Sequence, residues 1–422
     1  MLLQFNFKNF KSFREEATLD LTAAKITEKP EHIVPLGQEK VLPVAAVFGA
    51  NASGKSNVVE ALRFMQTYVL ESFGYGGETS DRAKKERAAR RSPFAFDLSG
   101  KSDPSFFEVY FITSAEEGCK SFHYGFALNE SGVVEEWLNV KAKTAREFKP
   151  VFYRGCEEET DLSGLPPRSR DNLLDALEKE TLIVSLGAKL KIDKLKAVRN
   201  WFAKLDFSNF GDPLENVILS RLIPAGFADS KEIQDDVVHF FSAFDPSITG
   251  FRVRTMRRTP EDNDSAAHVE IDAIHRIPGT NQTAAIPLEE ESEGTLKMFA
   301  LYPMLREARK NGGIFCIDEL NSKLHPLLVR NILIAFLNPA LNPKHAQLIF
   351  TTHDAWQMSN NLLRRDEIWF TEKNAAGVSS LYSLADFVDS DGVKIRKDEN
   401  YEKNYLLGKY GAIPTLKCFD IA

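Results

Sequence analysis

Residues 49–56 read Gly-Ala-Asn-Ala-Ser-Gly-Lys-Ser, and they decide how the rest of the chain is interpreted. They fit the pattern G-x-x-x-x-G-K-[ST], in which backbone N–H groups wrap around phosphates at the start of a helix. Val44 to Phe48 is a short apolar run before the loop, and Ser56 to Val69 has a helical pattern after it. Because strand, loop and helix follow in this order, the sequence predicts a phosphate-binding loop rather than a chance glycine turn.

Each position of this loop has an expected role. Gly49 and Gly54 permit the curvature, and Lys55 is expected to reach the β- and γ-phosphates of a nucleotide. The Ser56 hydroxyl is expected to ligate Mg²⁺. ATP and Mg²⁺ are therefore the predicted cofactors. The predicted nucleotide-binding residues of the loop are Gly49, Asn51, Ala52, Ser53, Gly54, Lys55, Ser56 and Asn57.

Two adjacent carboxylates, Asp318 and Glu319, end the apolar run Ile314 to Ile317. A phosphate site that uses a metal needs acidic side chains at the carboxyl end of a strand. We expect Asp318 to hold Mg²⁺ through water and Glu319 to orient or deprotonate the attacking water. An ordinary turn capped by carboxylates would explain the pair if it stood alone. The phosphate-binding loop upstream favours the catalytic interpretation.

Two further motifs follow the same logic. The apolar run Leu348 to Thr352 is expected to deliver His353 to the same sheet edge, where a histidine can hydrogen-bond a phosphate or the attacking water. A lone histidine is more often structural, but its place after the Asp-Glu pair favours a functional role.

Residues 291–295, Glu-Ser-Glu-Gly-Thr, open a helix with Ser292 as its N-cap, and a helix N-terminus can bind an anion.

This order of motifs resembles the ABC-type ATPases, and more narrowly their SMC, RecF and OLD-like branch, in which a turn like Asn9-Phe10-Lys11-Ser12-Phe13 follows the first strand. The resemblance implies a homodimer or a higher homo-oligomer in which two chains enclose two ATP molecules. Each signature motif would then contact the phosphate held by the other chain. The resemblance assigns Ser292, Gly294 and Thr295 to the signature motif. It assigns Asp318 and Glu319 to the Walker B motif and His353 to the switch histidine. The catalytic residues that it implies are Lys55, Glu319 and His353.

The sequence also departs from that pattern. The signature reads S-E-G-T, and Gln66 follows Lys55 too closely to be the usual Q-loop glutamine. No long coiled coil is present, so the chain is not a full-length SMC protein.

Segments such as PSFFEVYF and LRRDEIWFTEK resemble short bacterial anti-phage ATPases of the RloA or AbiL kind. That resemblance implies an ATPase that senses a cue for an abortive-infection effector in another chain, with a nuclease as one option.

The predicted fold is α/β: an ABC-type P-loop ATPase core with a mixed sheet and helices, an antiparallel β subdomain and a compact helical insertion. Leu2 to Phe7 and Ala17 to Leu21 alternate like a hairpin, and Phe106 to Thr113 and Phe122 to Leu128 alternate like paired antiparallel strands. The expected divisions are an N-terminal ATPase lobe with the β subdomain over 1–160, the helical insertion over 161–250, and a C-terminal lobe with the signature, Walker B and switch histidine over 251–422.

Charge and composition limit the other possibilities. The net charge of −7 argues against a surface that binds nucleic acid throughout, but basic clusters at 82–91 and 252–258 leave a local contact open. The alternative function is therefore a RecF- or SMC-like DNA-binding ATPase. A third possible function is a structural assembly held together by ATP.

The four cysteines form no CxxC pair and no apolar run reaches membrane-spanning length, so a cytoplasmic protein without a membrane partner is expected.

Overall fold

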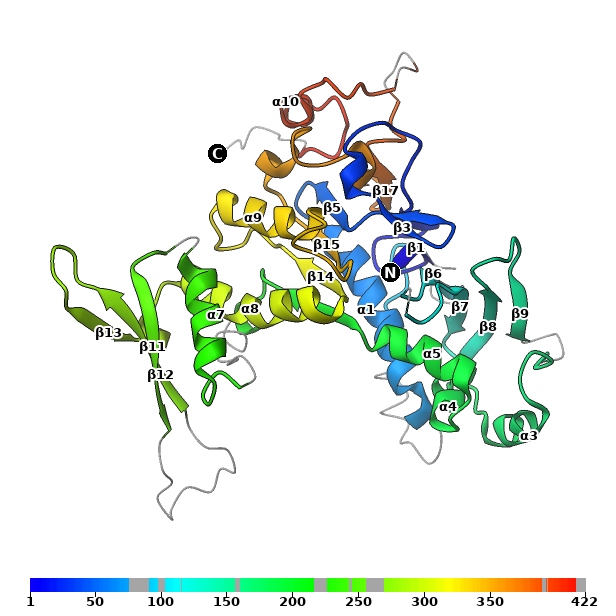
Figure 1. Ribbon diagram of the computed structural model, residues 1–422. Helices are drawn as coiled ribbons and strands as arrows, with labels where there is room; N and C mark the ends of the chain where they lie inside the picture. The colour runs from blue at the N-terminus through cyan, green and yellow to red at the C-terminus, as the bar shows by residue number, and fades with distance from the viewer. Residues whose placement is uncertain are drawn as a thin grey trace, which may run out of the picture.

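The computed structural model describes residues 1–75, 91–97, 103–114, 116–155, 160–215, 226–242, 245–255, 269–388, 392 and 394–414. In Figure 1 a central sheet, with β5, β14 and β15, lies between a wide antiparallel sheet and a smaller sheet accompanied by α7 (Lys231–Ser242). Most of the basic cluster at 82–91 and the end of the basic cluster at 252–258 lie outside the described residues.

The central sheet is mixed and has the strand order β10-β14-β15-β5-β16-β17. Its first five strands run parallel, and β17 pairs antiparallel with β16. β5 is an unbroken buried run, VAAVFG, as a parallel strand covered on both faces requires. The strands are β5 Val44–Gly49, β10 Leu205–Asn209, β14 Ile314–Asp318, β15 Gln347–Thr351, β16 Ile368–Lys373 and β17 Ser379–Ser383.

Successive side chains of β5 enter two different cores, because strand residues alternate between the two faces of a sheet. Ala45 and Val47 pack in the core that contains α1 (Lys55–Glu71) and the antiparallel sheet. Val44, Ala46 and Phe48 pack in the other core, which contains α8 (Glu293–Asn311) and α9 (Pro326–Leu337). The predicted α/β core with a mixed sheet and helices is confirmed.

The second large sheet is antiparallel and has the order β2-β1-β6-β7-β8-β9. Its inner face is aromatic, with Phe107, Phe111 and Phe126 fully buried in the core that also contains α1. The predicted N-terminal hairpin and the predicted antiparallel strand pair are both present. The strands are β1 Leu2–Lys8, β2 Ala17–Asp20, β6 Ser105–Ile112, β7 Ser121–Asn129, β8 Gly132–Lys141 and β9 Lys149–Arg154.

The segment 161–250 contains the expected helices but also a strand of the central sheet. The helices α3, α4 and α5 pack beside the antiparallel sheet, whereas α7 packs on β11 of the small sheet (Figure 1). Between them, β10 lies parallel to β14. The prediction of one compact helical insertion is therefore wrong, because β10, a strand of the central sheet, divides the segment. The predicted domain boundaries remain a prediction. The helices are α3 Pro167–Ala176, α4 Ile183–Lys189 and α5 Asp193–Phe202.

The segment 401–414 packs on the central sheet. Tyr401, Tyr405 and Tyr410 are buried, and the Tyr405 ring stacks on Phe370 with 5.5 Å between ring centroids. Within the described part of the chain, no helix has the length and apolar character needed to cross a bilayer. The remaining elements are α10 Tyr401–Leu406, β3 Val34–Leu36, β4 Glu39–Val41, β11 Ile248–Thr255, β12 Val269–Arg276, β13 Thr283–Pro287, η1 Pro30–His32, η2 Ser72–Gly74, η3 Leu288–Glu290, η4 Ala355–Gln357 and η5 Arg365–Glu367.

One buried carboxylate joins the antiparallel sheet to α4. Glu136 of β8 is fully buried and accepts hydrogen bonds from the backbone N–H groups of Ile183 (2.6 Å) and Val184 (3.0 Å) and from the Tyr124 hydroxyl (3.0 Å). Burial raises the pKa of Glu136 from about 4.5 to about 7, although these hydrogen bonds oppose the shift. The carboxylate therefore acts as an N-terminal cap for α4 that is costly to ionise.

This burial predicts a pH-dependent stability. Between pH 4.5 and pH 7 the folded chain holds a proton on Glu136 that the unfolded chain has released, so the free energy of unfolding falls as the pH rises through this window. From pH 4 to pH 8 the decrease due to Glu136 is expected to be about 3 kcal/mol. In urea unfolding, Glu136→Gln should lose that part of the pH dependence.

Glu135→Gln is the matched control, because Glu135 is the preceding residue of β8 and its side chain points to the opposite face of the sheet. It should keep the wild-type pH dependence. If Glu136→Gln also kept it, ionisation of Glu136 would not be responsible.

Candidate functional site

The loop after β5 curls tightly into the start of α1. Gly49 ends the strand with φ +152°, and a Cβ at this position would lie 2.5 Å from the Thr371 carbonyl oxygen. Gly54 precedes the first residue of α1 with φ +112°, and Ala52 between them is also left-handed, with φ +62°. Only glycine adopts such conformations without strain at 49 and 54, so the two glycines are required by the backbone path.

Hydroxyl groups from distant parts of the chain support the loop. The Ser53 Oγ lies 2.6 Å from Thr371 Oγ1 on β16. Ser379 of β17 places its Oγ 2.7 Å from both the Ser53 carbonyl oxygen and Ser12 Oγ. Asn57 of α1 donates to the same Ser12 hydroxyl over 2.7 Å. The turn at 9–13, which follows the first strand, therefore contacts the start of α1 through Ser12 and Asn57.

Lys55 is folded back over the loop. It is only 5% exposed, and its ammonium donates to the carbonyl oxygens of Gly49 (3.0 Å) and Ala50 (3.2 Å). Burial lowers the pKa of Lys55, while Glu319 and Asp318 act in the opposite direction. The two carboxylates expected at the site are thus near enough to influence this ammonium.

Thr351 of β15 holds the two carboxylate residues at the end of β14. Its hydroxyl donates to Asp318 Oδ1 over 2.5 Å and accepts from the Glu319 backbone N–H over 2.8 Å. Glu319 has a left-handed backbone with φ +55°, a conformation that non-glycine residues adopt uncommonly. Thr351 was not predicted as a site residue, although its place two residues before His353, at the end of an apolar strand, was an available signal.

His353 contacts the second carboxylate. Its Nδ1 lies 2.8 Å from Glu319 Oε2, and its Nε2 lies 3.1 Å from the side-chain nitrogen of Asn321. Thr352 fixes Asn321 by donating to its Oδ1 over 2.7 Å. Asn51 of the loop, Glu319 and His353 line one open hollow of about 400 Å³, so residues from three separate motifs meet in one place.

A comparison with family models identifies the family. The model described as "AAA domain, putative AbiEii toxin, Type IV TA system" matches residues 44–355, well over half of the chain, including the loop and both carboxylates. The chain belongs to this family. Its mixed sheet and loop are those of a P-loop ATPase, as the sequence predicted, whereas the SMC, RecF and OLD-like branch and the RloA or AbiL likeness remain predictions. No curated protein matches the chain.

In this AAA-family chain, the predicted signature residues lie at the start of α8. Ser292 caps α8 as expected, since its Oγ accepts from the Thr295 backbone N–H over 3.1 Å. Lys297 on the same helix donates to the Ser322 carbonyl oxygen over 2.7 Å, and burial lowers the pKa of Lys297 to about 8. Ser292, Gly294 and Thr295 are not among the residues that line the hollow of His353.

The residues of the site fit MgATP by their chemistry. The first N–H groups of a helix have no acceptor within the helix, and at α1 they follow a glycine loop with a lysine beside it, which suits a triphosphate. The Ser56 hydroxyl and the Asp318 carboxylate are hard oxygen ligands of the kind that Mg²⁺ prefers. These roles, and those of Asn57 and the signature residues, remain proposals.

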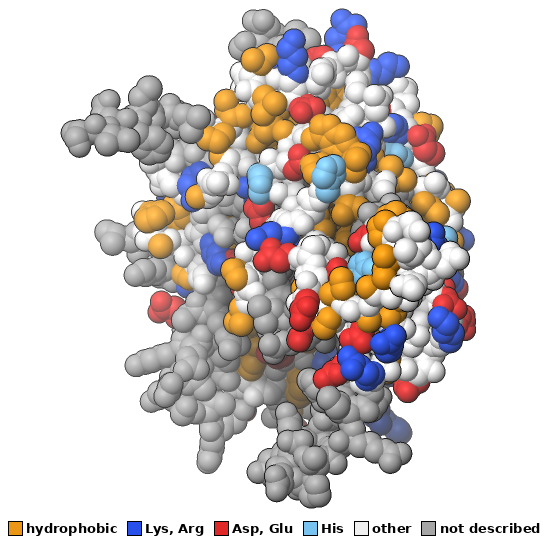
Figure 2. Space-filling model, turned by 90° about the vertical axis from the view of Figure 1, so that its left-hand side faces the viewer, with side chains coloured by type: hydrophobic (Ala, Val, Ile, Leu, Met, Phe, Trp, Pro, Cys, Tyr) orange, Lys and Arg blue, Asp and Glu red, His pale blue; other side chains and the backbone are white. Residues whose placement is uncertain are grey.

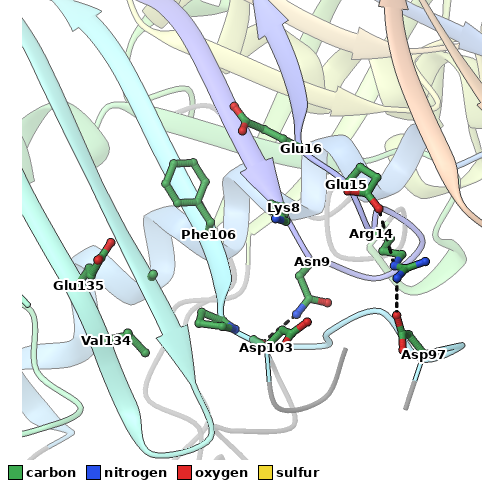
Figure 3. A pocket seen from close by; sticks show the side chains of 12 residues that line it. Lys8, Asn9, Arg14, Glu15, Glu16, Asp97, Asp103, Phe106, Val134 and Glu135 are labelled. Atoms are coloured by element: carbon green, nitrogen blue, oxygen red, sulfur yellow. Dashed lines mark hydrogen bonds and ion pairs between the residues drawn. The ribbon is translucent and has the colours of Figure 1, made fainter. Parts of the chain in front are cut away.

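A larger hollow elsewhere is less suited to a nucleotide. It measures about 550 Å³ and lies beside the turn at 9–13, where Glu15, Glu16 and Glu135 are among its carboxylates (Figure 3). Lys8 and Arg14 are the cationic residues in its lining. An excess of carboxylates disfavours a polyphosphate, so the smaller hollow at His353 is the better candidate.

Two arginines of the basic clusters, Arg91 and Arg254, have partners within the chain. Arg91 is only 3% exposed and donates to the carbonyl oxygens of Asp103 (3.0 Å) and Leu128 (2.9 Å). Arg254 of β11 forms an ion pair of 2.9 Å with Asp272 of β12. Arg91 is therefore a poor candidate for a nucleic-acid contact, whereas Arg254 stays exposed beside its partner.

Proposed function

We propose that the chain is a Mg²⁺-dependent ATPase whose reaction takes place between the loop at 49–56 and His353. The observation that carries this proposal is the 2.8 Å contact of His353 with Glu319, in a hollow shared with the phosphate-binding loop. Lys55 and the first turn of α1 bind the phosphates. Ser56 and Asp318 would hold Mg²⁺, which would neutralise part of the phosphate charge when bound.

Glu319 accepts a proton from the attacking water, and His353 keeps the Glu319 carboxylate in position. A general base must lie within hydrogen-bond reach of the proton that it takes, and the opening of the hollow leaves room for water beside Glu319. Asp318 is only 6% exposed and is already held by Thr351, so it suits a fixed ligand better than a base.

We further propose that two copies complete each other's sites. Ser292, Gly294 and Thr295 form a helix start that can bind an anion, yet they lie outside the hollow of their own chain. A second chain related by two-fold symmetry would bring its α8 to the phosphates bound by Lys55. Their absence from the lining of that hollow supports the dimer.

The cellular role that we propose is regulation of a toxic effector carried by a separate protein in anti-phage defence. The family description names a type IV toxin–antitoxin system, and this is the support for the proposal. The alternative is an ATPase that binds DNA directly. On the face shown in Figure 2, Lys and Arg side chains are interspersed with Asp and Glu, which favours the effector role over DNA binding.

Phosphate release from MgATP by the purified chain tests the catalytic proposal. We expect turnover that EDTA abolishes and that Lys55→Ala lowers by at least a hundredfold, because Lys55 compensates the charge of the β- and γ-phosphates. Lys310→Ala, at a surface position near the end of α8, is the control and should behave as wild type. Absence of turnover by the wild type would contradict the ATPase. Strong stimulation by DNA would favour the alternative function.

A further inference from the structure

Phe96 is the most exposed large apolar side chain in the described part of the protein, at 76%, and its ring lies beside Gly377 in the turn between β16 and β17. We propose that Phe96 is the platform on which the base of the bound nucleotide stacks. This inference rests on the proposed function and adds the residue that recognises the nucleoside end of the substrate.

The position of Phe96 is fixed from both sides. Phe94 is buried, and its backbone N–H donates to Asn9 Oδ1 over 2.9 Å. Asp97 forms an ion pair of 2.8 Å with Arg14, and Figure 3 shows these two side chains pointing toward each other. The rings of Phe94 and Phe96 meet edge to face with 5.6 Å between centroids. Phe96 is thus an exposed ring on an anchored segment, which is the requirement for a stacking surface.

A short path of contacts links Phe96 to the loop. A Cβ at Gly377, which has φ +78°, would lie 3.0 Å from the Phe96 ring, so glycine is needed there to let the ring approach the β16–β17 turn. Two residues further on, Ser379 places its hydroxyl 2.7 Å from the Ser53 carbonyl oxygen. Two extended residues span about 7 Å. Phe96 therefore lies within reach of a nucleoside whose phosphates occupy the loop.

The order of strands places Phe96 at the correct end of the nucleotide. Asp318, Glu319 and His353 follow β14 and β15, which lie on one side of β5 in the central sheet. These residues define where the terminal phosphate reacts. The nucleoside must then extend toward the other side of β5, where β16, β17 and Phe96 lie.

The chemistry of a phenyl ring defines what it can recognise. Stacking uses the π-face that every base has, and a purine offers a larger face than a pyrimidine. Phe96 therefore favours purine nucleoside triphosphates over pyrimidine ones. A phenyl ring forms no conventional hydrogen bond to the edge of a base, so it does not by itself distinguish adenine from guanine.

Calorimetric titration of the full chain with MgATP, MgCTP and inorganic tripolyphosphate tests the proposal. Phe96→Ala is expected to weaken MgATP binding about tenfold, to reduce the preference for MgATP over MgCTP, and to leave tripolyphosphate binding unchanged. Phe96→Trp should restore MgATP binding. Leu174→Ala removes an exposed apolar side chain of α3, far from the loop, and should bind all three ligands as the wild type does.

The outcomes separate this inference from the proposed function. If wild type and Phe96→Ala bind MgATP equally, the platform is refuted while the ATPase stands. If Phe96→Ala weakens tripolyphosphate as much as MgATP, Phe96 supports the loop and does not contact the base. If the wild type binds neither MgATP nor tripolyphosphate, the proposed function and the inference both fail.

Discussion

Glu319→Gln is expected to lower the rate of MgATP hydrolysis by about a hundredfold or more while MgATP still binds. The glutamine keeps the size of the side chain, and its carbonyl oxygen can still face His353, which lies 2.8 Å from Glu319 in the wild type. It cannot take a proton from water. The phosphate-binding loop and Asp318 are untouched, so the substrate complex should accumulate.

The measurements are the rate of phosphate release, the affinity for MgATP and the mass of the particle by light scattering. With MgATP, Glu319→Gln should double in mass, because binding without hydrolysis leaves the proposed dimer closed. Glu372→Gln is the matched control, since Glu372 is an exposed carboxylate near the end of another core strand, β16. Turnover by Glu319→Gln within about twofold of the wild type would exclude Glu319 as the general base.

Mixing two inactive variants is expected to restore activity if the two chains share their sites. Lys55→Ala removes the phosphate-binding ammonium of a chain, and Ser292→Arg blocks the signature that this chain offers to its partner. A mixed dimer has one site with both changes and one site with neither. Equal amounts should therefore recover about a quarter of the wild-type turnover, since half of the random pairs are mixed and each has one intact site.

Lys55→Ala mixed with Glu319→Gln is the control for this experiment, because both changes affect the site of their own chain. Every site in that mixture carries one of the two defects, and turnover should stay low. Two affinity tags would show that mixed dimers form. If they form and the mixture of Lys55→Ala with Ser292→Arg stays inactive, or if Ser292→Arg alone is fully active, the shared site is wrong.

The core of the fold was predictable because its decisive signals are local. β5, the glycine loop and α1 follow each other in the sequence, and each is recognisable from its own residues. The same holds for β14, which ends at Asp318, and for β15, which precedes His353. Parallel strands present their carboxyl ends at one edge of the sheet, so the meeting of these motifs followed from the strand pattern.

β10 was missed because nothing in its own five residues requires a strand. Leu205 and Phe207 continue the apolar pattern of α5, and the pairing partner of β10 is β14, more than one hundred residues later in the sequence. Gln66 fixes this junction by donating from its side chain to the carbonyl oxygens of Phe202 (2.8 Å) and Leu205 (2.6 Å).

The details that orient the site were also beyond the sequence. The left-handed backbone of Glu319 and the two hydrogen bonds of Thr351 depend on how β14 and β15 end side by side. A motif identifies which residue types are present. It does not specify which neighbouring hydroxyl fixes a carboxylate, because that partner comes from another strand.

The position of β5 in the sheet has a consequence for synthesis on the ribosome. β5 is made early, but its two neighbours are β15 and β16, which are translated about three hundred residues later. Ser379, which supports the loop, is 367 residues away from Ser12. A nascent chain therefore emerges with the nucleotide-binding strand unpaired for most of translation. During that time we expect the proposed nucleotide site to stay incomplete and the apolar strand to be prone to aggregation.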